Sequence, residues 1–385
     1  MFAERMRGIK KSGIREIFDL AQTLPDHINL GIGEPDFRTP SFVRVAARKA
    51  MREGFTRYTS NVGIPELREA IALKLKRENR ITVDPSSEVI VTAGATQSIF
   101  ILMNILLNPG DEIILPSPLF TAYKYCATLA GARAVEVPLD ENDGYSLDPK
   151  KIERAITKKS RVLVLNSPCN PTGAVYTRKQ IEETCRIAAN NGMYVISDEI
   201  YEKFLYDGAE HFSPASKAEL KNSVITINGL SKTFAMTGWR IGYTAASADI
   251  ISMMTLYNMY NAVCASSFVQ SAAASALEHS TDYFNSILRR FARRRDLLCR
   301  GLAEIGFRFK RPMGAFFVFA SLPGARRNSL EFCKDLLLKK RVSTVPGSTF
   351  GEGGEGHIRL SYSVDERKIR LALGRIQDFV RGNSK

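Results

Sequence analysis

Short apolar runs alternate with longer amphipathic stretches through the first two thirds of the chain. The runs are rich in valine, isoleucine and leucine, and they begin at Glu88, Asp111, Arg133, Arg161, Met193, Ser223 and Trp239. Continuous apolar runs of this length are typical of parallel strands buried on both faces, and the stretches between them are long enough for crossover helices. The pattern predicts an α/β fold in which a mainly parallel, seven-stranded sheet lies between helices.

Two helix starts in this region are marked by capping residues. Thr177 and Gln180 have the spacing of a capping box, which predicts a helix through Ala189. Asp148 followed by Pro149 predicts a second start, because proline is favoured in the first helical turn. The crossovers are therefore expected to be helical.

The last third of the chain has a different pattern. From about residue 252 it is helical for about fifty residues, and residues 307–321 and 342–363 then alternate in strand fashion around one helix. A final amphipathic helix is predicted from Asp365. Because 385 residues exceed a typical single core, this change of pattern indicates a second, smaller α+β domain.

Polar clusters follow three of the apolar runs directly, at residues 166–173, 197–201 and 228–240. In open α/β sheets, ligands bind beyond the carboxyl ends of the strands. The three clusters therefore predict one ligand site at this edge of the sheet.

Lys232 in the third cluster suggests the chemistry of that site. A lysine with its stem in apolar surroundings can lose its proton near neutral pH and condense with an aldehyde. Most lysines of the chain are better explained as exposed side chains whose stems cover an apolar surface. Lys232 differs because it follows a strand and lies beside two other polar clusters.

The neighbouring side chains extend this hypothesis. Asp198 follows a buried strand and is suited to pair with a protonated heteroaromatic nitrogen. Tyr201 and Asn170 are suited to hydrogen-bond a phenolate oxygen, and the guanidinium fork of Arg240 is suited to a phosphate. Together these are the requirements of pyridoxal 5′-phosphate.

At this point the chain resembles the fold-type I, class I aminotransferases, which use pyridoxal phosphate. The resemblance runs through residues 30–37, 57–68, the three polar clusters and residues 357–362, and so covers nearly the whole chain. Within that family it is most similar to the aspartate and aromatic branch found in archaea. In the family the N-terminal segment completes the small domain. The resemblance thus implies a large cofactor-binding domain at 46–280 and a small domain formed by 1–45 and 281–385.

The resemblance implies three catalytic residues. Lys232 would form a Schiff base with the cofactor and later move the proton between the substrate α-carbon and the cofactor C4′. Asp198 would keep the pyridine nitrogen protonated, so that the ring accepts electrons. Tyr201, together with Asn170, would hydrogen-bond the cofactor's 3-oxygen.

The resemblance also implies a place for the ring and the phosphate. Phe120 would stack on the pyridine face and border the substrate, although a core phenylalanine is the simpler interpretation of that residue alone. The backbone N–H groups of Ala95 and Thr96 would face the phosphate at a helix N-terminus. Taken alone, this segment is an ordinary helix start.

Further residues carried over by resemblance bind the substrate and a second subunit. Arg359 would grip the substrate α-carboxylate, with Asn170 and Gly33 beside it; an arginine on a strand is otherwise most often an exposed edge residue. Tyr58 would reach the phosphate of the partner subunit, which implies a homodimer with shared active sites.

In one respect the chain departs from the family, because several relatives carry a phosphate-binding serine where this chain has Gly229. Ser231 is a candidate substitute.

Composition bounds the remaining function classes. The net charge of +14 is compatible with a nucleic-acid surface, acidic small substrates or solubility, but no nucleic-acid motif accompanies it. Four histidines lack metal-binding spacing, and six cysteines lack paired spacing. The first residues have no apolar secretory segment, and no apolar stretch is long enough to cross a bilayer. We therefore expect a cytoplasmic protein without a metal.

The predicted reaction is transamination between an amino acid and 2-oxoglutarate or glutamate in a ping-pong cycle. The same family admits C–S or β-eliminating lyases, and a regulator built on the same scaffold is a third hypothesis. Aromatic and aspartate substrates both stay open, with a slight preference for aromatic ones. An acidic side chain would need a second cation, and Tyr260 or Phe37 are candidates for a ring-stacking wall. The candidate cations are Lys11, Arg15 and Lys124.

Overall fold

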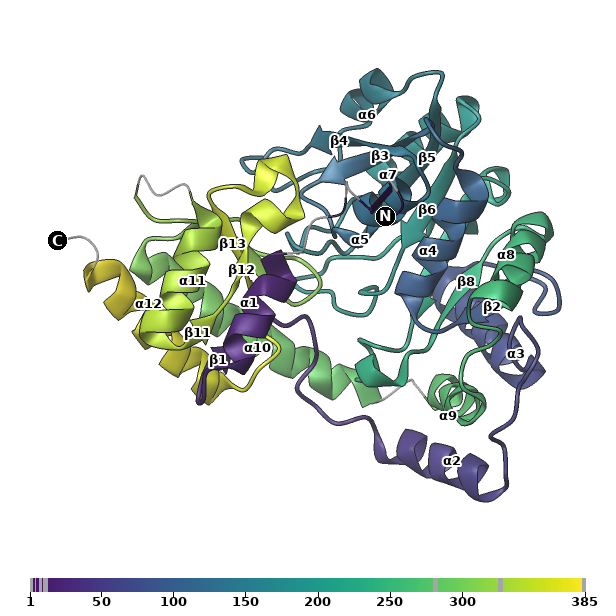
Figure 1. Ribbon diagram of the computed structural model, residues 1–385, viewed down its shortest axis with the longest axis horizontal. Helices are drawn as coiled ribbons and strands as arrows, with labels where there is room; N and C mark the ends of the chain where they lie inside the picture. The colour runs from purple at the N-terminus through teal and green to yellow at the C-terminus, as the bar shows by residue number, and fades with distance from the viewer. Residues whose placement is uncertain are drawn as a thin grey trace.

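The larger lobe of the protein, seen in a computed structural model, is built on a seven-stranded sheet (Figure 1). The structure describes residues 3, 5, 6, 9, 13–279, 283–324 and 328–382. The sheet has the strand order β2-β8-β7-β6-β5-β3-β4. Its strands are β2 (Val89–Thr92), β3 (Glu112–Ser117), β4 (Arg133–Pro138), β5 (Ser160–Asn166), β6 (Tyr194–Asp198), β7 (Val224–Gly229) and β8 (Gly242–Ala245).

The directions of these strands match the predicted fold class. Strands β4, β3, β5, β6 and β7 are parallel, whereas β8 is antiparallel to both β7 and β2. The strand expected from Trp239 begins three residues later, at Gly242, because Thr237–Trp239 forms a 3₁₀ turn and Arg240 has a left-handed φ of 54°. The prediction of a mainly parallel, seven-stranded sheet is confirmed.

Helices cover both faces of this sheet. Helices α4, α5 and α8 pack on one face in a core that includes Ile113, and α6 and α7 pack on the other face with Ile114. Helices α2, α3 and α9 pack together beside the β2 and β8 edge. The bounds are α2 (Ser41–Arg52), α3 (Pro65–Lys74), α4 (Ala95–Leu106), α5 (Ala122–Leu129), α6 (Pro149–Ala155), α7 (Arg178–Asn190), α8 (Ala248–Asn261) and α9 (Ser267–Glu278).

Both predicted helix caps are present. The hydroxyl of Thr177 accepts a hydrogen bond from the Gln180 N–H, and the Gln180 side chain accepts one from the Thr177 N–H, so α7 begins in a capping box. The Asp148 carboxylate caps α6 by accepting hydrogen bonds from the backbone N–H groups of Lys150 and Lys151. One detail has no counterpart in the predictions: α3 continues into a π-helical turn, Leu75–Asn79.

The smaller lobe combines residues 13–29 with the described part of residues 283–382 (Figure 1). Strand β1 (Ile28–Asn29) pairs in parallel with β11 (Val342–Ser343), and a second sheet has the order β12-β13-β10-β9. The other strands are β9 (Arg308–Phe309), β10 (Phe317–Ser321), β12 (Val345–Pro346) and β13 (His357–Ser361). The helices are α1 (Gly13–Gln22), α10 (Tyr283–Ile305), α11 (Ser329–Lys340) and α12 (Glu366–Gly382).

A phenylalanine-rich core joins this lobe to the loop after β6. Phe204 contacts Phe284, Phe291 and Phe316 edge to face, with ring centroids between 4.9 and 5.2 Å apart. The loop that carries Tyr201 is therefore packed against α10 and β10. Among the helices that the structure describes, none is both long and apolar enough to cross a membrane.

Candidate active site

A cavity of about 260 Å³ lies at the carboxyl ends of β5 and β6, next to the start of α4. Apart from Tyr58, every residue that the family resemblance assigned to the cofactor or to the substrate α-carboxylate lines it. These residues are Gly33, Ala95, Thr96, Phe120, Asn170, Asp198, Tyr201, Lys232, Arg240 and Arg359. The three polar clusters, far apart in the sequence, therefore meet in one place.

Lys232 follows β7 and reaches across to the N-terminal segment. Its Nζ atom donates a hydrogen bond to the carbonyl oxygen of Gly33 at 2.7 Å and lies 5.9 Å from the centre of the Tyr201 ring. Burial lowers the pKa of this amine to about 8, and the positive charge of Arg359 acts in the same direction. An amine with this pKa is largely available as a nucleophile at slightly alkaline pH.

Asp198 is the last residue of β6, with a side chain that is 4 % exposed. Its carboxylate accepts hydrogen bonds from the Tyr123 hydroxyl at 2.7 Å and from the Ile200 N–H at 3.2 Å. Burial raises the pKa of Asp198 to about 6, and these two hydrogen bonds oppose the rise. Below about pH 6 the carboxyl group thus needs a positive partner to stay ionised, and a protonated ring nitrogen is such a partner.

Arg359 lies on β13 and is 3 % exposed. Its Nη1 donates to Asn170 Oδ1 at 2.8 Å, and its Nη2 donates to the Gly31 carbonyl oxygen at 2.6 Å. The guanidinium lies 4.4 Å from the centre of the Phe317 ring. Burial lowers its pKa to about 10, and no carboxylate forms an ion pair with it in the described part of the chain. A buried, unneutralised guanidinium favours an anionic ligand.

The opposite end of the cavity is suited to a phosphate. Ala95 and Thr96 begin α4, where the first backbone N–H groups have no partner within the helix. Arg240 lies beside them, anchored by a hydrogen bond from Nη1 to the Thr237 carbonyl oxygen at 2.9 Å. Gly94 makes this proximity possible, because a Cβ atom there would lie 2.5 Å from Arg240 Nη2.

Gly229, the departure from the family pattern, is tightly enclosed at the end of β7. A Cβ atom at this position would lie 3.1 Å from the Gly242 Cα and 3.3 Å from the Ile200 side chain. The neighbouring Ser231 lines the cavity. The structure thus places a hydroxyl two residues later, where the sequence suggested a substitute.

Comparison with known proteins identifies the family of this chain. The family model for aminotransferase class I and II matches residues 25–376. The chain belongs to this family. The chain is 42% identical over 381 residues to an aspartate aminotransferase of Pyrococcus abyssi, covering 98% of both proteins. It is also 41% identical over 377 residues to an aromatic-amino-acid aminotransferase of Thermococcus litoralis, covering 97% of both.

Solved structures lead to the same conclusion. Aspartate aminotransferase from Thermus thermophilus with maleate superposes with a TM-score of 0.94 at 39% identity, over 98% of this chain and 99% of that one. Aromatic aminotransferase from Pyrococcus horikoshii superposes with a TM-score of 0.89 at 41% identity, over 96% and 99%. The protein is an aminotransferase, as the sequence predicted, and a lyase is not favoured.

The aminotransferase site does not include every candidate from the sequence. Tyr58 is 86% exposed and lies outside the cavity of its own subunit. The side chain of Arg15 pairs with Asp19, and that of Lys124 pairs with Glu136 at 2.8 Å, so neither of these cations lines the cavity. Phe37 and Tyr260 do not line it either, and Lys11 lies outside the described residues.

Several lining residues were not predicted. Tyr123, the hydroxyl partner of Asp198, lies three residues after Phe120, and this closeness to a predicted site residue was a usable signal. Asn166 is the first residue of its polar cluster and donates to the Asp198 carbonyl oxygen at 3.0 Å. Ile14 and Ile99 gave no chemical signal, because apolar residues in helices are usually core.

Proposed function

We propose that this aminotransferase uses pyridoxal phosphate and transfers the amino group of an aromatic amino acid or aspartate to 2-oxoglutarate, with glutamate as the product, in a ping-pong cycle. The observation that carries the proposal is the convergence of Lys232, Asp198 and Arg359 on one cavity. This reaction requires an amine that reacts with the cofactor aldehyde, a buried acid that pairs with the ring nitrogen and a buried guanidinium that binds the substrate α-carboxylate.

The residues of the cavity fit the cofactor in their charges and their hydrogen-bonding groups. The N-terminus of α4 and Arg240 supply donors for a phosphate, and Asp198 supplies a carboxylate for a ring nitrogen. Asn170 Oδ1 already accepts from Arg359, so the amide NH₂ is the group left to donate to a phenolate oxygen. Among the described residues, Arg359 Nε is a buried donor without a partner, as expected where a ligand completes the site.

Pyridoxal phosphate, when bound, supplies an aldehyde that takes up the amino group and a ring that accepts the electrons released with the α-proton. Lys232 would hold the cofactor and carry the proton between the substrate α-carbon and the cofactor C4′. Asp198 would keep the ring nitrogen protonated, and Tyr201 would donate to the 3-oxygen. Arg359 would orient the substrate through its α-carboxylate. Phe120 and Gly33 would enclose the substrate.

The lining of the cavity favours an uncharged side chain on the amino donor. Its cations in the described part of the chain are Lys232, Arg240 and Arg359, and each has an assigned task. Ile14 and Ile99 add apolar surface. A β-carboxylate buried without its own cation would cost on the order of a few kcal/mol. Aspartate, and equally the γ-carboxylate of glutamate or 2-oxoglutarate, would therefore need a cation from another subunit.

We also propose a homodimer in which Tyr58 completes the partner's phosphate site. Exposed apolar side chains support this proposal: Tyr58 is 86% and Tyr260 is 84% exposed, and α8 presents Met253, Leu256 and Met259 at 45–50%. Apolar side chains of this size concentrated on one helix mark an interaction surface. The phenolic Tyr58 would then act from the opposite subunit.

Two further parts of the proposal concern organisation and location. The division into 46–280 and 1–45 with 281–385 is supported by the pairing of β1 with β11, although the boundary at 280 and 281 lies outside the described residues. A cytoplasmic location is supported by six free cysteines, five of them buried.

The visible spectrum of the purified protein tests the function. We expect an absorption band of enzyme-bound cofactor that phenylalanine and glutamate convert to the amino form, and that 2-oxoglutarate restores. Aspartate should convert it with a lower kcat/KM than phenylalanine. A band that amino acids shift without conversion would contradict transamination, and a colourless protein that does not take up added pyridoxal phosphate would contradict the cofactor.

A further inference from the structure

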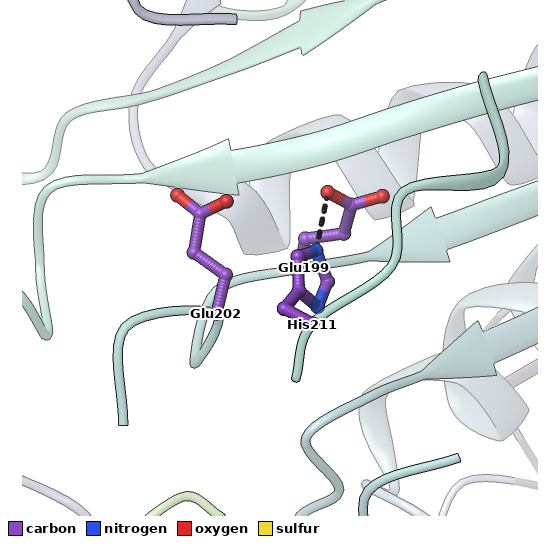
Figure 2. A group of neighbouring side chains, drawn as sticks. All are labelled: Glu199, Glu202 and His211. Carbon is purple, nitrogen blue, oxygen red and sulfur yellow. Dashed lines mark hydrogen bonds and ion pairs between the residues drawn. The ribbon is translucent and has the colours of Figure 1, made fainter. Parts of the chain in front are cut away.

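A buried polar network lies beneath the loop that follows β6. Glu199 is completely buried, and its Oε2 accepts hydrogen bonds from Ser213 Oγ at 2.6 Å and from Asn79 Nδ2 at 3.2 Å. His211 Nε2 lies 2.9 Å from the same oxygen (Figure 2). The other oxygen, Oε1, accepts from Ser197 Oγ at 2.8 Å. This carboxylate is therefore surrounded by donors from the π-helical turn, β6 and the segment at 211–213.

A second carboxylate, Glu202, extends the network. Its Oε2 accepts from Asn79 Nδ2 at 2.6 Å, and its Oε1 pairs with the Lys74 ammonium, which is 5% exposed. Lys74 also donates to Asn79 Oδ1 at 2.7 Å. Asn79 therefore connects the two carboxylates, and Lys74 supplies a buried positive charge beside them.

The three side chains Glu199, Glu202 and His211 have the donor types of a metal site, and their ligand atoms lie within 4.8 Å of one another (Figure 2). The surroundings argue against that role. Lys74 already provides the cation, and a divalent ion next to its ammonium would be repelled. The hydrogen-bond donors that converge on Glu199 also satisfy its carboxylate without a metal.

The position of the network in the chain indicates its task. Glu199 follows Asp198 directly, and Glu202 follows Tyr201 directly, so the two buried carboxylates lie next to two residues of the active site. The Glu199 N–H donates to the Ile227 carbonyl oxygen at 2.9 Å, and the Glu202 N–H donates to the Glu199 carbonyl oxygen at 2.9 Å. Anchoring these two side chains thus fixes the backbone turn between them.

We propose that Glu199 is a positioning residue that holds Asp198 and Tyr201 at the angle the cofactor requires, with Asn79, Ser213 and His211 as its supports. This inference rests on the proposed use of pyridoxal phosphate. Glu199 lies behind the cavity and touches neither cofactor nor substrate in this scheme. Its effect is transmitted through the covalent bond to Asp198 and the turn that carries Tyr201.

Glu199→Gln tests the proposal because it keeps the size of the side chain but directs an NH₂ group at converging donors. Glu182→Gln is the matched control: Glu182 accepts from Arg178 at 2.7 Å and lies 3.3 Å from Lys217 Nζ, and neither of these partners belongs to the network around Glu199. Hydrogen–deuterium exchange of residues 198–204 measures the loop without reference to the cofactor. We expect faster exchange in Glu199→Gln than in the wild type and no change in Glu182→Gln.

Enzyme kinetics and cofactor binding measure the consequence in folded holoenzyme. We expect Glu199→Gln to weaken pyridoxal phosphate binding and to lower kcat by about tenfold to a hundredfold, as for a small misplacement of catalytic groups. The KM for phenylalanine should stay within about twofold, because Arg359 is untouched. A purely structural residue would lower the melting temperature and leave these values unchanged in the folded fraction.

A milder variant keeps the test decisive if Glu199→Gln does not fold. Ser213→Ala removes one donor only, and it should change the same quantities in the same direction by a smaller factor. Unchanged exchange, cofactor affinity and kcat in a folded variant would overturn the inference. Failure of the wild-type protein to bind pyridoxal phosphate would instead overturn the proposed function, whereas the exchange measurement would still decide whether Glu199 orders the loop.

Discussion

Lys232 Nζ lies 2.7 Å from the carbonyl oxygen of Gly33, a residue 199 positions earlier in the chain. The contact joins the segment after β1 to the end of β7, and so it closes the cavity between the two lobes. A Cβ atom at Gly33 would lie 3.2 Å from the Phe317 ring, so a larger residue would push this segment away from the amine. The amine that we propose as the nucleophile is thus held by a backbone carbonyl group of the N-terminal segment.

Replacement of Lys232 by alanine should remove activity and preserve the fold. The amine is the only group assigned both to hold the cofactor and to move the proton, so we expect turnover to fall by roughly three orders of magnitude or more. Circular dichroism and thermal unfolding report the fold, and Lys221→Ala, which removes a lysine paired with Glu88, is the control. Near-normal turnover in folded Lys232→Ala would contradict the assignment.

The capture of pyridoxal phosphate by cofactor-free enzyme should depend on pH through Lys232. Only the neutral amine attacks an aldehyde, and burial lowers the pKa of this amine to about 8. The rate of capture should therefore rise as the pH increases toward 8 and level off above it. Stopped-flow absorbance between pH 6 and about 10 measures the profile. A rate that continues to rise toward the ordinary lysine pKa would show that the amine is not perturbed.

Gly94→Ala should weaken cofactor binding through Arg240. The new Cβ would lie 2.5 Å from Arg240 Nη2, so the guanidinium must leave its position at the phosphate end. We expect a loss of affinity of roughly tenfold, as for one charge-assisted contact. Gly54→Ala is a matched control, because Gly54 also has a positive φ, 78° against 91°, but nothing lies within 4 Å of its Cβ position. Equal affinities of the two variants would refute the steric mechanism.

The sequence predicted the sheet well because six of its seven strands are largely buried, and the exception is the edge strand β4. The run before Asp198 is one example: Val195 and Ile196 are completely buried, and the polar residues that follow mark the strand end. Strand exits on parallel strands meet at one edge, so Asn170, Asp198 and Lys232 could be grouped into one site from the sequence alone.

Pairwise contacts across the two lobes could not be predicted in the same way. The local sequence of Arg359 does not indicate that Asn170 accepts its hydrogen bond, because the two residues are 189 positions apart, and the family resemblance alone placed them in one site. The buried network around Glu199 was also missed. Its members are ordinary polar residues on three separate segments, and only the packing removes them from water.

Asp198→Ala should separate cofactor chemistry from substrate binding. Loss of the carboxylate removes the partner of the ring nitrogen, so exchange of the substrate α-proton in deuterated water should slow by two or more orders of magnitude, roughly the effect of one electrostatic group. Cofactor affinity should also fall, and the KM for phenylalanine should change little, since Arg359 is intact. Nuclear magnetic resonance of the recovered amino acid measures the exchange. Wild-type exchange in the variant would refute the electron-sink role of Asp198.

His211 should make the stability of the protein depend on pH. Burial lowers the pKa of its imidazole, and the positive charge of the Lys74 ammonium acts in the same direction. The carboxylates of Glu199 and Glu202 raise this pKa by more, so the net pKa lies above 6.5. A raised pKa stabilises the folded state fully below the unfolded value near 6.5, and this contribution is lost as the pH rises through the folded value.

His211→Gln keeps a donor toward Glu199 but cannot titrate. The difference in unfolding free energy between wild type and His211→Gln, measured by urea denaturation, should therefore be largest in mild acid and shrink toward alkaline pH. A difference that grows with pH, or does not vary, would show that the pKa of His211 is not raised in the folded protein.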